Sequence, residues 1–191
     1  TIPEGYRITE IAALLHEQGL GDPDVFIRET QDKDLIRSLG IPINSLEGYL
    51  FPETYHFSKF TPETTIVKKM VDTFKDQISK AQLLQSAKES SLSWHEIITL
   101  ASLIEKETGL DSERKMISSV FHNRLRKNMR LQTDPTVIYA IEKFDGNIRK
   151  RDLKIDSPYN TYRYKGLPPG PIASPGIKSI VAAMSPIESD K

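Results

Sequence analysis

The stretch WHEIITLASLIEKET, residues 94–108, decides the fold, because it carries the strongest helix signal in the chain. Ser93 before it and Glu96 three residues later have the spacing of a capping box, which fixes the start of a helix. Gly109 follows as a typical C-terminal stop. Apolar residues cover well over half of the helical circumference, so the spacing predicts a helix that is largely buried.

Two carboxylates lie at the edges of this apolar face. On a helical wheel Glu105 and Glu107 fall on either side of it, close to the helix C-terminus. Burial and the helix dipole both raise the pKa of a carboxyl group in such a place, as a general acid working near neutral pH requires. The alternative is that each glutamate forms a structural ion pair with an arginine that follows it in the chain. The candidate partners are Arg114, Arg124 and Arg126.

The chain before this helix has three further helical patterns and one segment of different composition. Apolar residues at helical spacing predict helices over 8–18, 23–38 and 61–80. Residues 46–57, LEGYLFPETYHF, are rich in aromatic residues and are interrupted by glycine and proline, which favours extended structure. Residues 80–92 are polar and serine-rich, so they mark a candidate domain boundary.

The chain after the central helix alternates between helices and one long loop. Residues 112–127 have apolar positions three to four apart, which predicts a helix. Another helix is expected from Asp134 to about Phe144. Residues 156–176 are rich in proline, glycine and tyrosine, and a loop of that length inside a domain is usually functional or disordered. Ser174 and the proline after it then begin a last helix.

The composition excludes several classes of protein. Among 191 residues, 26 are Lys or Arg and 26 are Asp or Glu, so there is no positive excess with which to bind nucleic acid. No apolar run approaches the roughly 20 residues that cross a bilayer. Cysteine is absent, and the 4 histidines are scattered without metal-binding spacing. We therefore expect no metal and no cofactor.

Aromatic and amide residues gather in the segments that are predicted to be extended or looped. Sugars stack on aromatic rings and bond to planar amides and carboxylates, so an aromatic cleft that faces a buried glutamate suits glycan cleavage. The alternative is that these side chains only pack the loops onto the core. The residues concerned are Tyr49, Phe51, Tyr55, Tyr159, Asn160, Tyr162 and Tyr164.

Four segments together resemble, in order and spacing, the motif series of the endolytic murein transglycosylases, the MltG/YceG-like family. They are LEGYLFPETYHF (46–57), ASLIEKET (101–108), SVFHNRLRKNMRLQTDPTVIYAI (119–141), and YNTY with GLPPGPIASPG (159–176). In addition, TIPEGYRITEIAALL at the start of the chain is similar to the segment where the LysM-like region of that family leads into its catalytic domain.

The resemblance implies an activity and a set of site residues. Such proteins cleave nascent peptidoglycan strands between N-acetylmuramic acid and N-acetylglucosamine, and leave a 1,6-anhydro-muramoyl end. Their single catalytic glutamate corresponds to Glu105, with Glu107 as the rival. Further positions match family motifs and are candidates for substrate binding, although capping or packing could explain each. These candidates are Glu47, Tyr55, Glu107, Gln132, Asp134, Asn160 and Tyr162.

The expected architecture is α+β. A small mixed module that adjoins the LysM-like region, residues 1–58, is expected to precede a mainly helical catalytic domain, residues 59–191, truncated at its C-terminus. The resemblance implies an anchor in the bacterial cytoplasmic membrane, through an N-terminal helix that this chain lacks, with the enzyme on the periplasmic side. It also implies peptidoglycan strands as substrate and cell-wall synthases, the penicillin-binding proteins, as partners.

Two other functions fit the same residues. A peptidoglycan-binding or scaffold module would use the aromatic segments without cutting the glycan, but it gains nothing from a buried Glu105. A true glycoside hydrolase needs a second carboxylate as nucleophile or base. A lytic transglycosylase does not, because the attacking hydroxyl belongs to the sugar itself and its effective concentration is very high.

Overall fold

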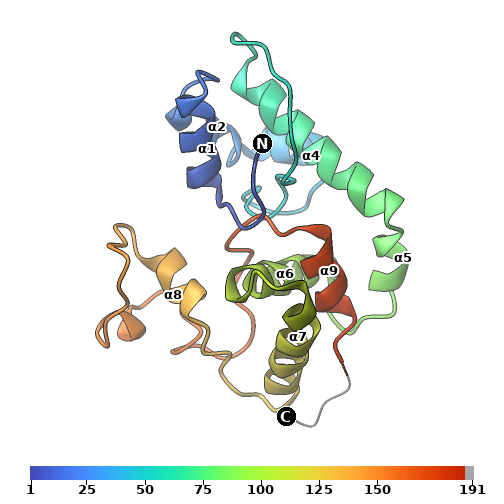
Figure 1. Cartoon of the computed structure of the whole chain (residues 1–191), viewed down its shortest axis with the longest axis vertical. Helices are drawn as coiled ribbons and strands as arrows, with labels where there is room; N and C mark the ends of the chain where they lie inside the picture. The colour runs from blue at the N-terminus through green and yellow to red at the C-terminus, as the bar shows by residue number, and fades with distance from the viewer. Residues whose placement is uncertain (188–191) are drawn as a thin grey trace.

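Helix α6 (Trp94–Glu107) lies at the centre of the computed structural model, which describes residues 1–187 (Figure 1). The predicted capping box is confirmed, since the Ser93 hydroxyl accepts from the Glu96 N–H and the Glu96 carboxylate accepts from the Ser93 N–H at 2.8 Å. Every residue from 97 to 104 is buried. The prediction of a largely buried helix is therefore confirmed.

Three later helices pack against α6. These are α7 (Asp111–Arg126), α8 (Asp134–Ala140) and α9 (Ile177–Met184). Helix α9 contacts both α6 and α7, so the last helix of the described chain packs directly against the central one. Helix α8 is shorter than expected, and α9 begins at Ile177 after a Gly176 cap rather than at the expected Ser174.

Five helices precede α6. They are α1 (Ile8–Glu17), α2 (Pro23–Glu29), α3 (Lys33–Ser38), α4 (Glu63–Lys80) and α5 (Leu83–Ala87). The single helix expected over 23–38 is instead the pair α2 and α3. The break occurs because Asp32 caps a new helix, with its carboxylate accepting from the Leu35 N–H at 2.7 Å.

The expectation of an α+β fold is wrong for residues 1–187, which are mainly helical and contain no strand. Residues 46–57 were expected to be extended, and residues 1–58 to mix strands with helices. Instead the 46–51 segment is a buried irregular loop whose backbone groups bond to other parts of the chain. The Leu46 N–H donates to the Thr30 carbonyl at 2.9 Å and the Phe51 N–H to the Met70 carbonyl at 3.3 Å. Aromatic and aliphatic content favoured a strand, but no neighbouring strand exists to pair with.

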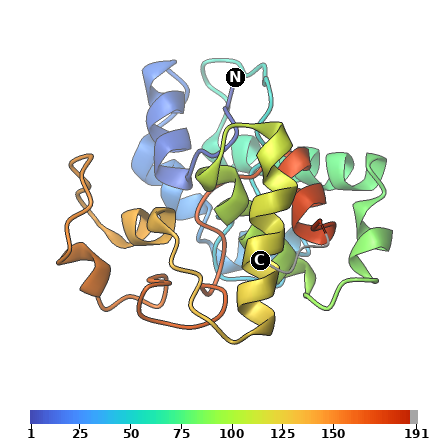
Figure 2. The same cartoon turned by 60° about the horizontal axis from the view of Figure 1, so that its bottom comes forward.

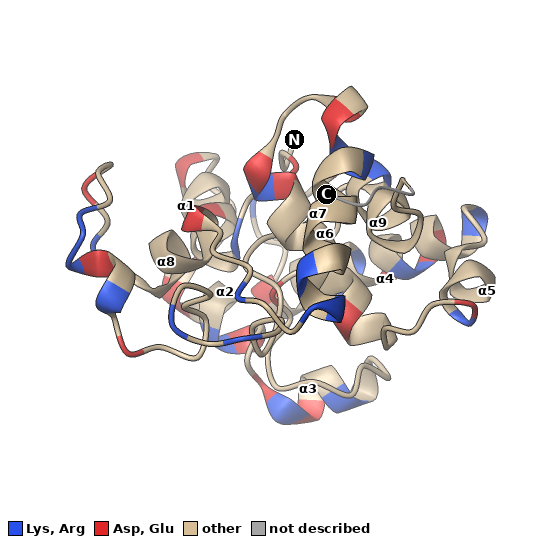
Figure 3. Cartoon of the chain, turned by 90° about the horizontal axis from the view of Figure 1, so that it is seen from below, with Lys and Arg blue, Asp and Glu red and all other residues tan. Residues whose placement is uncertain are grey.

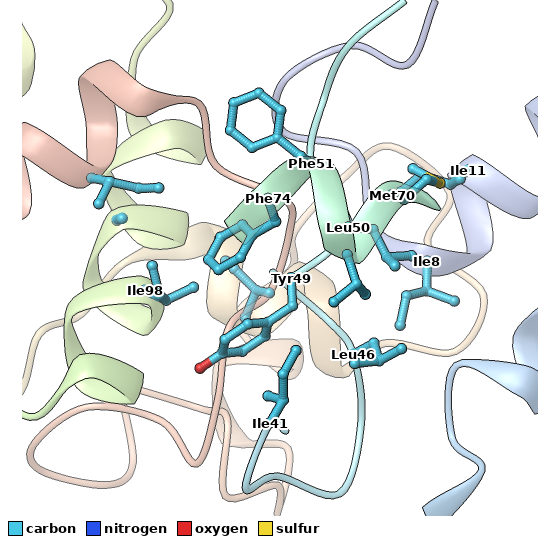
Figure 4. Packing of buried hydrophobic residues seen from close by; sticks show 14 of the residues in the cluster. Ile8, Ile11, Ile41, Leu46, Tyr49, Leu50, Phe51, Met70, Phe74 and Ile98 are labelled. Carbon is cyan, nitrogen blue, oxygen red and sulfur yellow. The ribbon is translucent and has the colours of Figure 1, made fainter. Parts of the chain in front are cut away.

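One hydrophobic core joins the two halves of the sequence. Leu46, Tyr49 and Leu50 insert between α1, α4 and α6, where they meet side chains such as Met70 and Ile98 (Figure 4). Gly48 permits this approach, because its φ is +83° and a Cβ there would lie 2.4 Å from the Cβ of Pro171. Residues on both sides of position 58 contribute to this core. The domain boundary at residue 58 stays a prediction.

The N-terminal segment is fixed against the end of the 156–176 loop. The Gly5 N–H donates to the Ser174 carbonyl at 2.9 Å, and the Ser174 N–H donates to the Tyr6 carbonyl at 2.8 Å. This short pairing holds residues 4–6 over the C-terminal end of α6.

The segment from 141 to about 156 projects from the helical body and includes a short 3₁₀ helix, η1 (Asp152–Lys154) (Figures 1 and 2). Lys and Arg positions are intermixed with Asp and Glu positions along the ribbon seen from below (Figure 3). None of the helices within residues 1–187 combines the length and the apolar character needed to cross a bilayer.

Candidate active site

Glu105 lies near the C-terminal end of α6, with only 6% of its side chain exposed. Its Oε1 is 3.3 Å from Nη1 of Arg114, and its Oε2 accepts from the Gly176 N–H at 2.9 Å. Because Gly176 is the N-cap of α9, the carboxylate also caps that helix. The sequence left two interpretations of Glu105 open. The structure contains the ion pair with an arginine, and that arginine is Arg114.

Arg114 is the centre of a larger polar cluster. Its side chain is 6% exposed, and its Nη1 donates to the Ser179 hydroxyl at 3.0 Å as well as to Glu105. Its Nε donates to Asp111 at 3.2 Å, while Lys178 pairs with the same aspartate from α9. The guanidinium therefore meets more than one carboxylate, and each of them stabilises its charge in a nearly dry environment.

Glu4 brings a further carboxyl group to this cluster from the N-terminal segment. Its Oε2 is 3.8 Å from Nη2 of Arg114, and about half of its side chain is exposed. The carboxyl group lies against Gly176, where an added Cβ would approach Oε1 to 1.8 Å, so a larger residue there would displace the Glu4 side chain. Burial and then the charge of Glu105 raise the pKa of Glu4. The sequence analysis missed this residue, which lies outside every helical pattern.

A groove runs between the N-terminus of α1 and α8, and we call it the α1/α8 groove. Two adjoining hollows of about 270 and 400 Å³ form it and share Arg7 and Tyr139. Lys106 lines the smaller hollow, and its Nζ donates to the Gly5 carbonyl at 3.1 Å. A Cβ on Gly5 would lie 3.7 Å from Cγ of Glu105. Glu105 itself lines neither hollow. Its chain neighbour Lys106 does, and the N-terminal segment at Gly5 lies against Glu105.

Glu47 lines the larger hollow and is 6% exposed. Its carboxylate accepts from the Ile8 N–H at 3.1 Å, which caps α1, and from the Tyr139 hydroxyl at 3.2 Å. Burial raises its pKa to about 7. Tyr139 packs on Tyr159 with ring centroids 4.8 Å apart, and its own pKa is raised by burial and by the charge of Glu47. The sequence analysis missed Tyr139, because it sought aromatic residues in loops rather than on helices.

Glu107 belongs to a third polar group, where α6 approaches the start of α8. The Thr133 hydroxyl donates to the Glu107 carboxylate, and the Tyr162 hydroxyl donates to Asp134 at 2.6 Å. The hydrogen bond to Asp134 raises the pKa of Tyr162 to about 12. The structure thus brings three of the candidate residues together at a place distinct from Glu105.

The remaining three candidates lie in or beside structural contacts. The amide of Asn160 is fully buried and donates to the carbonyls of Leu153 at 3.1 Å and Ile155 at 2.9 Å, which holds the loop. The Gln132 N–H donates to the Thr161 carbonyl at 3.2 Å in the same region. Tyr55 is elsewhere, with its hydroxyl bonded to the Phe51 carbonyl at 2.7 Å.

Comparison with known proteins gives one consistent result. The model of the YceG-like family matches residues 1–191. The chain is 38% identical over 205 residues to an endolytic murein transglycosylase of Bacillus subtilis. The alignment covers all of this chain and 56% of that protein. The chain is 33% identical to an endolytic murein transglycosylase of Streptococcus pneumoniae serotype 2, of which it covers 39%. The chain therefore spans about half or less of these curated relatives.

A solved structure agrees with the sequence relatives. The crystal structure of a yceG-like protein from Listeria monocytogenes superposes with a TM-score of 0.88 at 38% identity, over 99% of this chain and 67% of that chain. The arrangement of helices described above is therefore the arrangement of that protein as well.

Proposed function

Because the chain belongs to the YceG-like family, we propose that it is the catalytic part of an endolytic murein transglycosylase, which cuts peptidoglycan strands between N-acetylmuramic acid and N-acetylglucosamine. The observation that carries the assignment of the site is the position of Glu105. It is a buried carboxyl group with two fixed hydrogen-bond donors, and its chain neighbour Lys106 lines the α1/α8 groove.

In the proposed reaction Glu105 acts first as acid and then as base. Its carboxyl proton passes to the oxygen that leaves with N-acetylglucosamine, as the bond from that oxygen to C1 of N-acetylmuramic acid breaks. The 6-hydroxyl of the same N-acetylmuramic acid then bonds to C1 and gives its proton to the Glu105 carboxylate. No water is consumed, and the acid form of Glu105 is restored.

The surroundings of Glu105 suit both steps. Arg114 and the Gly176 N–H stabilise the negative charge that appears when the proton leaves, and both donors are already in place before the reaction. Since Gly5 covers Glu105, the glycosidic oxygen reaches the carboxyl group once residues 4–6 shift.

The α1/α8 groove is the proposed binding site for the glycan strand. Arg7 and Lys106 line it together with Glu10, Glu47 and Glu142, so the groove offers both donors and acceptors to the hydroxyl and amide groups of the sugars. Glu47 lines the groove directly, and we propose that Asp134 and Tyr162 extend the binding site at the start of α8. Of the other proposed binding residues, Glu107 and Gln132 also lie near the start of α8. Asn160 and Tyr55 stabilise the loops in which they lie through hydrogen bonds to backbone carbonyls.

The proposal extends to the full-length protein. The motif resemblance supports an anchor in the cytoplasmic membrane through an N-terminal helix, with the catalytic part on the periplasmic side. It also supports action on new glycan strands beside the penicillin-binding proteins that polymerise them.

The assignment is tested with uncross-linked glycan strands and mass analysis of the products. The full-length protein is expected to give 1,6-anhydro ends, and Glu105→Gln is expected to reduce their formation by about 10²-fold or more. Glu107→Gln tests the rival carboxyl group on the same helix and is expected to lower the activity much less than Glu105→Gln does. Reducing ends in place of anhydro ends would show a hydrolase, and glycan binding without any product would show a binding module.

A further inference from the structure

The cluster around Arg114 contains more carboxyl groups than cations. Glu4, Glu105 and Asp111 face the guanidinium, and Lys178 is the second cation, through its pair with Asp111. With all five groups ionised, the cluster has one unbalanced negative charge in a partly buried place. Such a charge is costly, and the cluster lowers this cost by retaining a proton.

Two of the three carboxyl groups lie against the same residue. Oε2 of Glu105 accepts from the Gly176 N–H at 2.9 Å, and the Glu4 carboxyl group occupies the space that a Cβ on Gly176 would need, with Oε1 at 1.8 Å from that position. Both also approach the Arg114 guanidinium, on Nη1 and Nη2 respectively. The two groups are therefore close enough for the charge of each to act on the other.

Asp111 does not hold the extra proton near neutral pH. Its hydrogen bond with Lys178 lowers its pKa, and about half of its side chain is exposed. By contrast, burial and the charge of Glu105 raise the pKa of Glu4. The charge of Glu105 therefore acts on Glu4, so the state of one carboxyl group affects the other.

We propose that Glu4 is a positioning residue of the catalytic centre, which acts by sharing one proton with Glu105 beside Arg114. The proposal rests on the proposed function, because it explains how Glu105 keeps its acid form. Arg114 and the Gly176 N–H stabilise the carboxylate form of Glu105, which is the wrong form for the first step. The negative charge of Glu4 opposes them, so that the proton stays available at the pH of the reaction.

The other charged groups near the pair come from three helices, and none of them replaces Glu4. Lys106 is the neighbour of Glu105 on α6 and bonds to the Gly5 carbonyl. Arg114 and Asp111 come from α7, and Lys178 comes from α9. Glu4 therefore contributes a negative charge close to Glu105, and the lysine of the cluster, Lys178, pairs with Asp111 instead.

The first test is the pH profile of the full-length enzyme. Glu4→Gln removes the charge and keeps the shape of the side chain, so the alkaline limb of the rate is expected to move to lower pH by about one unit. The rate at pH 8 then falls about tenfold, while the rate near pH 5 and the KM change little. Glu4→Asp is expected to restore most of the profile, and Glu17→Gln, an exposed charge at the end of α1, serves as control.

The second test does not depend on activity. Carbon-13 labelled glutamate allows the Glu4 carboxyl resonance to be followed through a pH titration. In Glu105→Gln the midpoint of Glu4 is expected to fall by about one pH unit, since the neighbouring charge is gone. An unchanged midpoint would overturn the coupling.

The outcomes separate the two proposals. A uniform loss of rate at every pH in Glu4→Gln, with the profile unmoved, would mean that Glu4 has only a structural role and would overturn this inference. Full activity of Glu105→Gln would instead overturn the assignment of the catalytic residue, whatever Glu4 does. Circular dichroism and thermal unfolding of each variant confirm that the fold is kept.

Discussion

Glu105 and Glu47 occupy similar places in two halves of the molecule. Each is about 6% exposed, and each accepts from the N-terminal N–H of a helix, α9 for Glu105 and α1 for Glu47. They differ in the second partner, which is the guanidinium of Arg114 for one and the hydroxyl of Tyr139 for the other. Burial therefore does not decide the charge of a carboxyl group by itself, because a cation offsets its cost and a hydroxyl does not.

The comparison also identifies a rival for the catalytic role. Burial raises the pKa of Glu47 to about 7, and Glu47 lines the α1/α8 groove together with Arg7. On pKa alone it is well suited to donate a proton. Glu105 has instead the two donors that stabilise the carboxylate after the proton has left. Three variants, at Arg114, Glu47 and Tyr139, test this comparison.

Arg114→Met is expected to have the largest effect. It leaves Glu105 buried without its cation, which lowers the free energy of unfolding by about 3–5 kcal/mol at pH 8. Urea denaturation measures the change. Adding Glu105→Gln is expected to recover a large part of this loss, since the unpaired charge is removed. If the double variant were as unstable as the sum of the single ones, the ion pair would not be the cause.

Glu47→Gln is expected to have a smaller effect of the opposite sign. Burial raises the folded pKa of Glu47 from 4.5 to about 7, so its protonation stabilises the fold. That stabilisation is complete below about pH 4.5 and is lost as the pH rises through 7. Glutamine keeps the acceptor oxygen and carries no charge, so the variant is more stable than the parent by up to about 3 kcal/mol at pH 8 and equal to it near pH 4.

Urea denaturation at the two pH values tests the Glu47 prediction, with Glu89→Gln, an exposed charge in the loop after α5, as control. The same difference at both pH values would show that Glu47 is not the group that titrates.

Tyr139→Phe is expected to have the smallest effect. It removes the hydroxyl that donates to Glu47 and leaves the ring packed on Tyr159, so the free energy of unfolding falls by about 1 kcal/mol at pH 8. The loss is expected to shrink at low pH, where Glu47 is protonated. No change at either pH would mean that a water molecule replaces the hydroxyl.

The sequence predicted the helices whose signals are local. The capping box of Ser93 and Glu96 and the apolar spacing in α4 and α7 each depend on residues within one helix, and the three helices that they predict are present. The buried side of α7 differs from its apolar face, since it includes Arg114 and Asn123 while Met116 is 62% exposed. The 46–57 segment was predicted wrongly, because its aromatic composition is typical of strands while its environment is a set of helices. Whether such a segment pairs as a strand depends on its neighbours in space, which composition does not contain.

The candidate site was predictable only in part, for the same reason. The helical wheel indicated the burial of Glu105, and its possible partners included Arg114. Glu4 and Tyr139 were missed, since they meet their partners, Arg114 and Glu47, across a long stretch of chain. Even the pair of Glu47 with Ile8 connects residues that share no local pattern.

The pairing of Gly5 with Ser174 has a consequence for the order in which the molecule assembles. These residues stand near opposite ends of the chain, so their contact closes a very long loop and belongs to the slow, non-local part of folding. A chain that emerges N-terminus first holds Glu4 without Gly176 until α9 has followed it. The polar cluster around Arg114 is therefore completed after helices α1 to α8 have been synthesised.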